Sequence, residues 1–410
     1  MSKLKNNFFL NNLNGVLQVI AVNLVTSFAG LFLKRLNAND ELVSLFNSLP
    51  AFFSILAIFI GGIILTNTKN KKRTTSFAFL ITRFFYILIA LVPFLPDKLR
   101  PIAFVILYSA MNFPNSIAVF LWQSFIADIF PPGDREASLA SRSSIATIAG
   151  TATTLITGFL LTSLSRNKSQ LITFYQIAFV IAFFIGIIEV ITLLMHRERK
   201  NAAYAEVSTN GNKISLDFLI NLPKHKEYFV FIICVIIFHF TWQMAWPLFL
   251  TYEVDYLKTN EMWAAIISTI NGIAMAYGYR FWGRFSKNNG NSAAITIASL
   301  GMALAPFFYS ISTKIYHVTY FVALTGFSVS GVMLLLLNSL YEVSPRENRT
   351  SFIAFYNLVT NITLVISPWI GMRLSHFTGI KSAFVIVGFL RILSGLTFLI
   401  RHKKQQAEVL

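Results

Sequence analysis

Few residues of this sequence have the types and spacing that chemistry requires, and most of its charged residues lie outside the long apolar runs. The six histidines are scattered singly and Cys234 is the only cysteine, which excludes a disulfide framework and a Cys/His metal cluster. The sequence also lacks the Gly-x-x-x-x-Gly-Lys-Ser/Thr loop that cradles phosphates, and no Ser/His/Asp arrangement has a recognisable context. We therefore predict a protein that is not an enzyme and that uses no cofactor or metal.

His239 is the one histidine in the middle of an apolar run, and it shares a helix face with three large side chains. Trp242, Gln243 and Trp246 follow it at spacings of three, four and seven residues. An imidazole titrates near physiological pH, so a histidine in a cavity can bind a solute or carry a proton. The alternative is a neutral, hydrogen-bonded histidine that only packs helices together. The face predicts four substrate-binding residues, of which His239 is also a candidate for proton coupling.

Neutral polar residues recur at helical spacing in three further runs. They are Asn14 with Gln18, Tyr108 with Asn112 and Asn115, and Asn357 with Asn361. Hydrogen bonding between helices in a membrane explains each of them taken singly, and lining of a central cavity is the other interpretation. Together with the His239 face, they describe a pocket that is aromatic and neutral-polar. We therefore add Gln18 and Asn112 to the predicted substrate-binding residues.

Three charged residues lie clearly inside apolar runs, where a charge is costly and needs a reason. Glu189 is the only such acid among 17 acidic residues, and it is a second candidate for proton coupling, near the inner end of its run. Arg83 and Arg391 have two interpretations. Each is held by a buried partner or extends toward the membrane surface, or it forms a site for an anionic solute. No carboxylate is found in the middle of a run.

The apolar runs dominate the composition and exclude a water-soluble protein. Charged residues make up 12% of the 410 residues, whereas a typical soluble domain has roughly 25%. Apolar residues make up 55%, and the mean hydropathy is +0.63. Runs of this kind cross a hydrocarbon core of about 30 Å as helices. We predict twelve spans, at 8–33, 41–66, 74–95, 102–128, 139–164, 170–195, 228–252, 262–286, 292–312, 316–341, 350–376 and 380–401.

The net charge of +17 is distributed in a way that favours a membrane protein over a protein that binds nucleic acid. If the N-terminus is cytoplasmic, 22 Lys and Arg residues lie on the inner side of the membrane, 10 lie outside and two lie within the runs. This bias follows the positive-inside rule and places both termini in the cytoplasm. The inner basic residues also attract anionic lipid head groups. We expect a multi-pass protein of the cytoplasmic membrane that contacts lipids and binds no nucleic acid.

The longest stretch between runs, 196–227, is charged and divides the chain into two halves of six runs each. A membrane protein divided in this way is expected to contain an internal repeat. We predict an N-terminal bundle of six helices at 1–195, a cytoplasmic linker at 196–227 and a C-terminal bundle of six helices at 228–410.

The repeat is visible as a motif, acid-x-x-Pro-x-x-x-Arg, at corresponding inner loops of the two halves. It runs from Asp128 to Arg135 after the fourth span, and from Glu342 to Arg349 after the tenth, 214 residues further on. Each copy fits a helix that ends near a proline and is followed by a helix that begins near an arginine. We predict that these four residues, with Arg142, form charge contacts at an inner gate.

A second pair of loops follows the second and eighth spans. The first contains Gly61-Gly-Ile-Ile-Leu-Thr66 and continues into a basic stretch, and the second contains Gly283-Arg284-Phe-Ser-Lys287. With the twelve spans and the central loop, these segments resemble the major facilitator superfamily over essentially the whole length. The resemblance implies an all-α membrane protein with 12 transmembrane helices in two pseudo-symmetric six-helix bundles. It also implies that Gly283 and Arg284 belong to the inner gate, with Thr66 and Lys287 where the family has an acid.

The resemblance further implies secondary active transport of a small molecule, in which the two bundles give alternating access to a site near the membrane midplane. We favour export of an amphipathic molecule, as in drug or metabolite efflux, because the inferred pocket is aromatic and has no matching charge. Nutrient uptake or an uncoupled facilitator is the alternative function. A non-transporting membrane sensor or scaffold is a third hypothesis. Protons are the coupling ion that the candidates suggest, and we expect a monomer.

Reporter fusions test the predicted orientation. Fusions that end at Arg166 or Lys314 should place alkaline phosphatase outside the cytoplasm and be active, because both residues fall in loops on the outer side. A fusion at the C-terminus serves as the cytoplasmic control and should be inactive. Active C-terminal fusions together with inactive fusions at the two loops would reverse the assigned orientation.

Overall fold

The computed structural model describes residues 2–68, 70–197, 221–345 and 349–409, and nearly all of them are helical. No strand occurs within these described ranges, which confirms the predicted all-α class for them. Eleven helical segments in the same ranges are long and apolar enough to cross a membrane. The predicted span at 262–286 is also a helix, but it is less apolar than these eleven.

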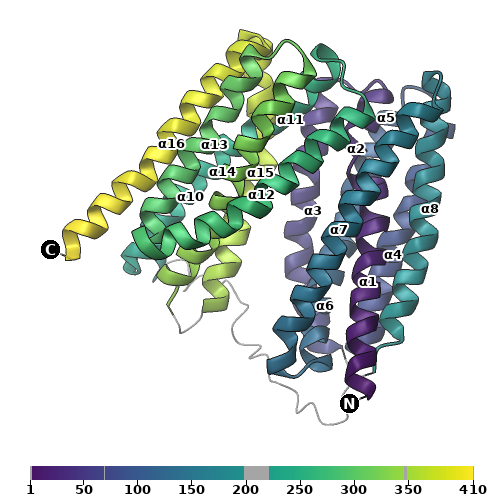
Figure 1. Ribbon diagram of the computed structural model, residues 1–410, viewed down its shortest axis with the longest axis horizontal. Coiled ribbons are helices and arrows are strands. Elements are labelled where there is room, and N and C mark those ends of the chain that lie inside the picture. Colours follow the sequence, from purple (N-terminus) through teal and green to yellow (C-terminus); the bar gives the residue numbers. More distant parts are fainter. Residues whose placement is uncertain (1, 69, 198–220, 346–348, 410) are drawn as a thin grey trace. The chain divides into compact units, whose positions relative to one another are not determined.

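The helices belong to two compact units, which we call unit 1 and unit 2. Unit 1 comprises Met1–Thr209 and Asn260–Ala265. Its helices run alongside one another as a bundle, with α1 packed against both α7 and α8 (Figure 1). Their bounds are α1 (Ser2–Thr26), α2 (Ala29–Arg35), α3 (Asp40–Asn67), α4 (Lys71–Leu91), α5 (Arg100–Ala110), α6 (Asn112–Ile129), α7 (Pro132–Leu164) and α8 (Lys168–Leu194).

Unit 2 comprises Asn210–Thr259 and Ile266–Leu410, so the first turn of α12 is grouped with unit 1. Within unit 2, α13 packs against α14 and α16, and α10 packs against α15 and α16. Its helices are α10 (Lys226–Met244), α11 (Trp246–Thr251), the π-helical turn η4 (Tyr252–Tyr256), α12 (Glu261–Asn289), α13 (Asn291–Ile311), α14 (Ile315–Val343), α15 (Arg349–Thr378) and α16 (Ile380–Val409).

Three of the spans that we predicted as single helices consist of two helices joined by a break. The breaks fall after Thr26, after Ala110 and after Met244. Pro114 and Pro247 explain the second and third breaks, because a proline has no amide hydrogen for the carbonyl four residues earlier. Span prediction from hydropathy alone does not see these interruptions, since both prolines lie inside strongly apolar sequence.

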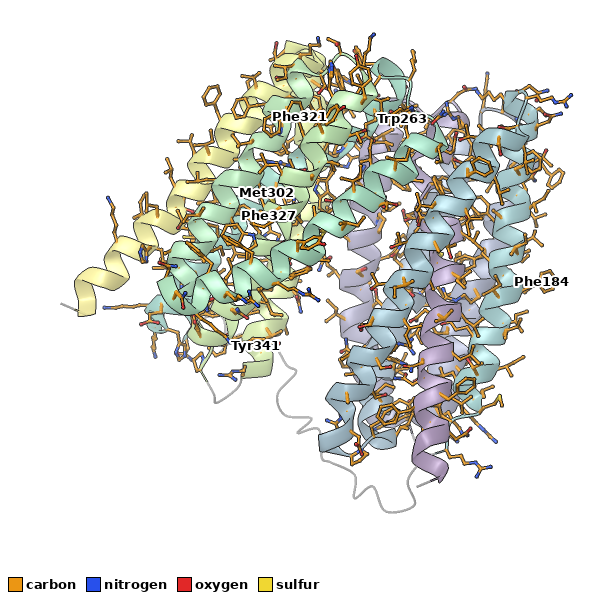
Figure 2. All side chains as sticks on the ribbon, in the orientation of Figure 1. Phe184, Trp263, Met302, Phe321, Phe327 and Tyr341 are labelled. Carbon is orange, nitrogen blue, oxygen red and sulfur yellow. The ribbon has the colours of Figure 1, made fainter. Side chains whose placement is uncertain are left out.

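The outer faces of the bundles are apolar and the interiors are closely packed. Phe184 on α8 is 59% exposed and points away from its bundle, as Figure 2 shows. Inside unit 2, a buried cluster includes Phe231 and Phe238 of α10, Met302 of α13 and Phe398 of α16. An apolar surface of this kind is satisfied by lipid chains, which supports a membrane-spanning bundle.

The contact between α1 and α7 is polar along much of its length, and we call it the α1–α7 seam. Side-chain amides of α1 donate to groups of α7 at successive levels: Asn11 to Ser138 Oγ at 2.9 Å, Asn12 to Ser141 Oγ at 2.9 Å, and Asn23 to the Gly150 carbonyl at 3.0 Å. Small polar partners and short side chains allow two helices in a membrane to approach closely. The seam therefore fixes how α1 lies against α7.

Arg83 of α4 and Glu189 of α8 form a buried ion pair. Arg83 Nε and Nη2 donate to the two carboxylate oxygens of Glu189 at 2.7 and 3.0 Å, and Nη1 donates to Tyr86 Oη at 2.5 Å. The two charged side chains are 1% and 2% exposed. Gly186 makes room for this arrangement, because a Cβ there would lie 2.6 Å from Arg83 Cδ. Of the two interpretations of Arg83, the structure supports the buried partner.

Removing one partner of this pair should destabilise the protein strongly. Arg83→Met or Glu189→Leu leaves an uncompensated buried charge, which costs about 3–5 kcal/mol. We expect a clear loss of thermal unfolding temperature in detergent for each single variant, and a large recovery in the double variant. Lys168→Met is the control, since Lys168 is an exposed basic residue of the same unit. Single variants that unfold at the wild-type temperature would show that the pair does not hold α4 to α8.

Candidate functional site

Arg142 of α7 is 6% exposed and is surrounded by polar side chains of α1. Its Nη1 donates to the backbone and side-chain oxygens of Asn11 at 2.9 and 3.0 Å, and to Asn14 Oδ1 at 2.9 Å. Its Nη2 donates to Gln18 Oε1 at 2.7 Å, and the ring of Trp122 on α6 is centred 4.6 Å from its Cζ. The structure thus brings together Arg142, which we predicted at the gate, and Gln18, which we predicted at the substrate.

The sequence of α1 builds this network on one face of the helix. Asn11, Asn14 and Gln18 are spaced by three and four residues, so their amides project toward α7 at successive turns. Gly15 lies between them, and a Cβ there would be 2.6 Å from Arg142 Cγ. Our sequence analysis missed Asn11, although it extends the Asn14 and Gln18 spacing by one further turn. Trp122 was not among the predicted site residues either.

In unit 2, His239 lies among aromatic rings. Its Nδ1 is 3.1 Å from the carbonyl oxygen of Val235, and because a carbonyl only accepts, Nδ1 donates. In the neutral ring, Nε2 is then an acceptor without a proton. The rings of Trp242 and Tyr356 are centred 5.6 and 6.1 Å from the imidazole, and Trp246 lies edge-on to Trp242 at 5.6 Å. This corner offers one polar acceptor within an aromatic wall.

The side-chain amides of Gln243 and Asn112 donate hydrogen bonds to backbone carbonyls of helices. Gln243 Nε2 donates to the Thr360 carbonyl of α15 at 3.3 Å, and its Oε1 is buried without a partner in the described part of the chain. Asn112 Nδ2 donates to the Tyr108 carbonyl at 2.9 Å, beside the break between α5 and α6. Gln243 therefore keeps a free acceptor for a solute, whereas Asn112 caps its own broken helix.

Arg391 of α16 is fully buried and caps the end of α10. Its Nε and Nη2 donate to the carbonyls of Thr241 and Trp242 at 3.4 and 2.5 Å, and Phe249 faces its guanidinium at 5.6 Å. The last carbonyls of a helix have no partner within the helix, and its C-terminal end favours a cation. The structure supports the buried-partner interpretation here as well, with backbone as the partner.

Glu253 directly follows the predicted span 228–252 and was not among the predicted site residues. It lies in the π-helical turn η4, partly buried, and its carboxylate accepts from Tyr309 Oη of α13 at 2.5 Å. No cationic side chain pairs with it among the described residues. Single π-helical turns are frequent at functional sites, so Glu253 joins the candidate groups of unit 2.

Two of the predicted gate residues, Glu342 and Arg349, have hydrogen-bond partners in their own unit. In unit 2 the Glu342 carboxylate accepts from Asn291 Nδ2 at the start of α13, and Arg349 Nη2 donates to the Tyr341 carbonyl at 3.4 Å. In unit 1 Arg135 lies partly buried near the start of α7, and the side chain of Asp128 lies outside the described residues. No ion pair joins Glu342 to Arg349 in the part of the chain that is described.

Gly283 and Arg284 lie on α12, beside a hollow of about 550 Å³. Its lining comes from α12 alone: Tyr277, Arg280, Phe281, Arg284, Phe285 and Asn288. Arginine and aromatic side chains therefore alternate along one side of this helix. Gly283 is in ordinary contact with its neighbour, since a Cβ there would lie 3.9 Å from Leu334.

His196 follows the C-terminal end of α8 and is 1% exposed. Its Nδ1 donates to the carbonyls of Thr192 and Leu193 at 3.0 and 3.1 Å, and its own carbonyl accepts from Lys72 Nζ at 3.2 Å. Burial lowers the pKa of His196 to about 4, because desolvation disfavours the charged imidazolium and outweighs the two backbone hydrogen bonds. His196 is therefore neutral at physiological pH.

The long apolar helices and the two units that they form are those of a polytopic membrane protein. The family model described as Major Facilitator Superfamily matches residues 12–322 and 231–409, and the chain therefore belongs to that superfamily. Among curated proteins, none matches this chain.

Solved structures show the same fold at low sequence identity. The nucleoside transporter NupG aligns with a TM-score of 0.72 at 14% identity, covering 98% of this chain and 100% of its own. The D-xylose-proton symporter aligns with a TM-score of 0.70 at 16% identity, covering 97% of each chain. A bacterial homologue of the human lysosomal transporter Spinster aligns at 0.67 and 13% identity, covering 98% of this chain and 96% of that one. At these identities the likeness concerns the fold.

Acidification should destabilise the protein in part through His196. The unfolded histidine binds a proton near pH 6.5 and the folded one only near pH 4, so stability present above pH 6.5 is lost as the pH falls toward 4. Between pH 7.5 and 5 the loss from this group is about 2 kcal/mol. His196→Gln should lose less unfolding temperature over this interval than wild type. His376→Gln, at an exposed histidine, is the control, and an unchanged pH response in His196→Gln would contradict the assignment.

Proposed function

We propose that this protein is a secondary active transporter that exports a small amphipathic molecule across the cytoplasmic membrane by alternating access. The observation that carries the proposal is the aromatic corner of unit 2. There the rings of Trp242 and Tyr356 face the imidazole of His239, whose Nε2 is an acceptor, and Trp246 packs edge-on against Trp242. Aromatic walls with few polar groups bind the apolar body and fix the orientation of such a solute. Membership of the superfamily supports transport as the activity.

Proton coupling through His239 is part of this proposal. Likeness to the D-xylose-proton symporter supports protons as the coupling ion. Glu189 was our second candidate, but its two oxygens are held by Arg83, so giving it a proton would break an ion pair. Glu253 can take up a proton more easily than Glu189, because its partner is the neutral hydroxyl of Tyr309 and not a cation. It is therefore the acid to compare with His239.

The gate is proposed to use the duplicated motif. Asp128, Arg135 and Arg142, together with Glu342 and Arg349, form inner-gate charge contacts in the outward-facing state. The proposal is supported by the presence of one copy of the motif in each half of the chain, after the fourth and the tenth predicted span. Gly283 and Arg284 of α12 belong to the same gate.

The proposed setting is the cytoplasmic membrane, with both termini inside, a monomeric protein, and lipids and the solute as its partners. Uptake of a nutrient, or uncoupled facilitated diffusion, is the competing hypothesis.

Transport assays in right-side-out and inverted vesicles, against a panel of solutes with and without a proton gradient, distinguish export, uptake and facilitated diffusion. Accumulation only in inverted vesicles supports export, accumulation only in right-side-out vesicles supports uptake, and equilibration without accumulation supports a facilitator.

His239→Gln should uncouple transport. Glutamine keeps a hydrogen-bonding side chain but cannot take up a proton near neutral pH. We expect loss of accumulation against a gradient, with downhill exchange of substrate preserved. Glu253→Gln tests the alternative acid of unit 2: loss of pH-dependent accumulation in that variant, with accumulation retained in His239→Gln, would move the proton site to Glu253. Uphill, pH-dependent transport by His239→Gln would show that this histidine only packs helices.

Arg135→Gln should slow transport while leaving substrate binding close to wild type. Removal of the charge weakens contacts of the closed inner gate but touches no predicted substrate-binding residue. Initial rates in proteoliposomes and equilibrium binding in detergent separate the two effects. Arg166→Gln, at an exposed arginine near the other end of α7, is the matched control. A normal transport rate in Arg135→Gln would remove this residue from the gate.

A further inference from the structure

We propose that Arg142 binds an anionic group of the transported solute, a carboxylate or a phosphate, and that Gln18 holds its place in the unloaded protein. The inference rests on the proposed transport function and names the substrate class: a small organic anion with an apolar body. This proposal differs from the sequence analysis, which predicted a pocket without a charge.

The first argument is the charge of Arg142. The guanidinium is buried, and all of its acceptors are neutral: the Asn11 carbonyl and the amide oxygens of Asn11, Asn14 and Gln18. No carboxylate pairs with it in the described part of the chain. A buried charge without a counter-charge costs several kcal/mol per ion. A solute that brings a negative charge removes that cost.

The neighbouring acid does not neutralise Arg142. Glu189 is the described acid nearest to the network, since Asn14 Nδ2 donates to its backbone carbonyl at 2.9 Å. However, both oxygens of its carboxylate are taken by Arg83. Arg83, Glu189 and Arg142 together therefore carry one net positive charge in the interior of unit 1.

The second argument compares Arg142 with two other buried arginines; the fourth buried arginine, Arg401, lies at the last residue of the predicted span 380–401. Arg83 has a carboxylate, and Arg391 is fixed on the backbone carbonyls of α10, so both have a structural role. Arg142 is held mainly by side-chain amides, which can rotate away. Gly15 gives it the space to lie across α1, which shows that the sequence accommodates an arginine at this place.

The third argument identifies the replaceable acceptor. Asn11 and Asn14 are fully buried, whereas Gln18 is only partly buried. An anionic oxygen can therefore take the position of Gln18 Oε1 at Arg142 Nη2 with little rearrangement. The exchange is favourable, because the anion adds Coulomb attraction to the guanidinium, which the neutral amide oxygen of Gln18 does not supply.

Trp122 supplies the remaining part of the site. Its ring faces the guanidinium at 4.6 Å, and its Nε1 is buried without a hydrogen-bond partner in the described part of the chain. The indole N–H is a second donor for the anion, and the ring is a flat apolar surface for the body of the solute. These features favour an aromatic or aliphatic acid over an inorganic anion as the physiological ligand.

Fluorescence quenching tests access of an anion to this site without knowledge of the substrate. The signal of Trp122 is obtained as the difference between wild type and Trp122→Phe. Iodide, an anionic quencher, should quench this signal at least about two-fold more than the neutral quencher acrylamide, because the guanidinium concentrates anions. In Arg142→Gln the excess should disappear, and in Arg142→Lys part of it should remain. Equal quenching by iodide and acrylamide in wild type overturns the proposal.

Gln18→Glu is the sharper variant, because it places a carboxylate where the solute anion should bind. With 3-phenylpropanoate and 3-phenylpropanamide as a matched acid and amide, wild type should bind the acid about ten-fold more tightly. Gln18→Glu should lose this preference and the iodide effect while keeping its unfolding temperature. Gln123→Glu, which adds the same charge at an exposed position of α6, should keep both.

Binding and transport are measured in separate experiments, so that the proposed transport function and the proposed anion site can be contradicted independently. Selective acid binding that Arg142→Gln abolishes, without transport in vesicles, contradicts the transport function and leaves an anion site. Transport of solutes with equal binding of acid and amide, or an iodide effect that survives in Gln18→Glu, contradicts the anion site and leaves the transport function.

Discussion

Water is absent from the interior of a lipid bilayer, so every charged group placed there must be satisfied by the protein itself. This constraint shapes both units. Four arginines are buried among the described residues. Three of them lie well inside the helices and are satisfied differently: Arg83 by the carboxylate of Glu189, Arg391 by carbonyls at the end of α10, and Arg142 by side-chain amides of α1. The fourth, Arg401 near the end of α16, lies over the ring of Phe231. The kind of partner decides the role, because a carboxylate or a carbonyl fixes an arginine, whereas amides leave its charge uncompensated.

The helix breaks follow from the same constraint. A proline inside a span frees a carbonyl that lipid cannot satisfy, so a polar side chain has to be nearby. At the end of α10, Arg391 donates to the carbonyls of Thr241 and Trp242, and at the break between α5 and α6, Asn112 donates to the carbonyl of Tyr108. These carbonyls lie one or two residues before the ones that the prolines leave without an amide partner. The interruptions and the polar residues beside them therefore form single structural features, and in α10 the break lies next to the aromatic corner around His239.

The features of the fold that depend on apolar length could be predicted from the sequence, and those that depend on pairing could not. Hydropathy located the spans and the class of fold, and helical spacing located the faces around Gln18 and His239. The partner of Arg83 is 106 residues away on α8, and no spacing rule connects them. The same is true of Arg142 and Asn11, 131 residues apart, so a residue interpreted at the gate proved to be bonded to the α1 face. Glu253 was undervalued because a π-helical turn has no clear sequence signal.

The α1–α7 seam has a consequence for the order in which the chain is made. The amides of α1 emerge first, yet the partner of Asn11 on α7 follows 127 residues later. At roughly 5–20 residues per second, α1 waits on the order of ten seconds or longer before α7 is synthesised. During that interval its asparagines are unsatisfied in lipid or are held by insertion factors. The first helix of this protein therefore stays in the membrane without its native hydrogen-bond partners until the seventh helix is inserted. Unit 1 becomes stable only late in synthesis.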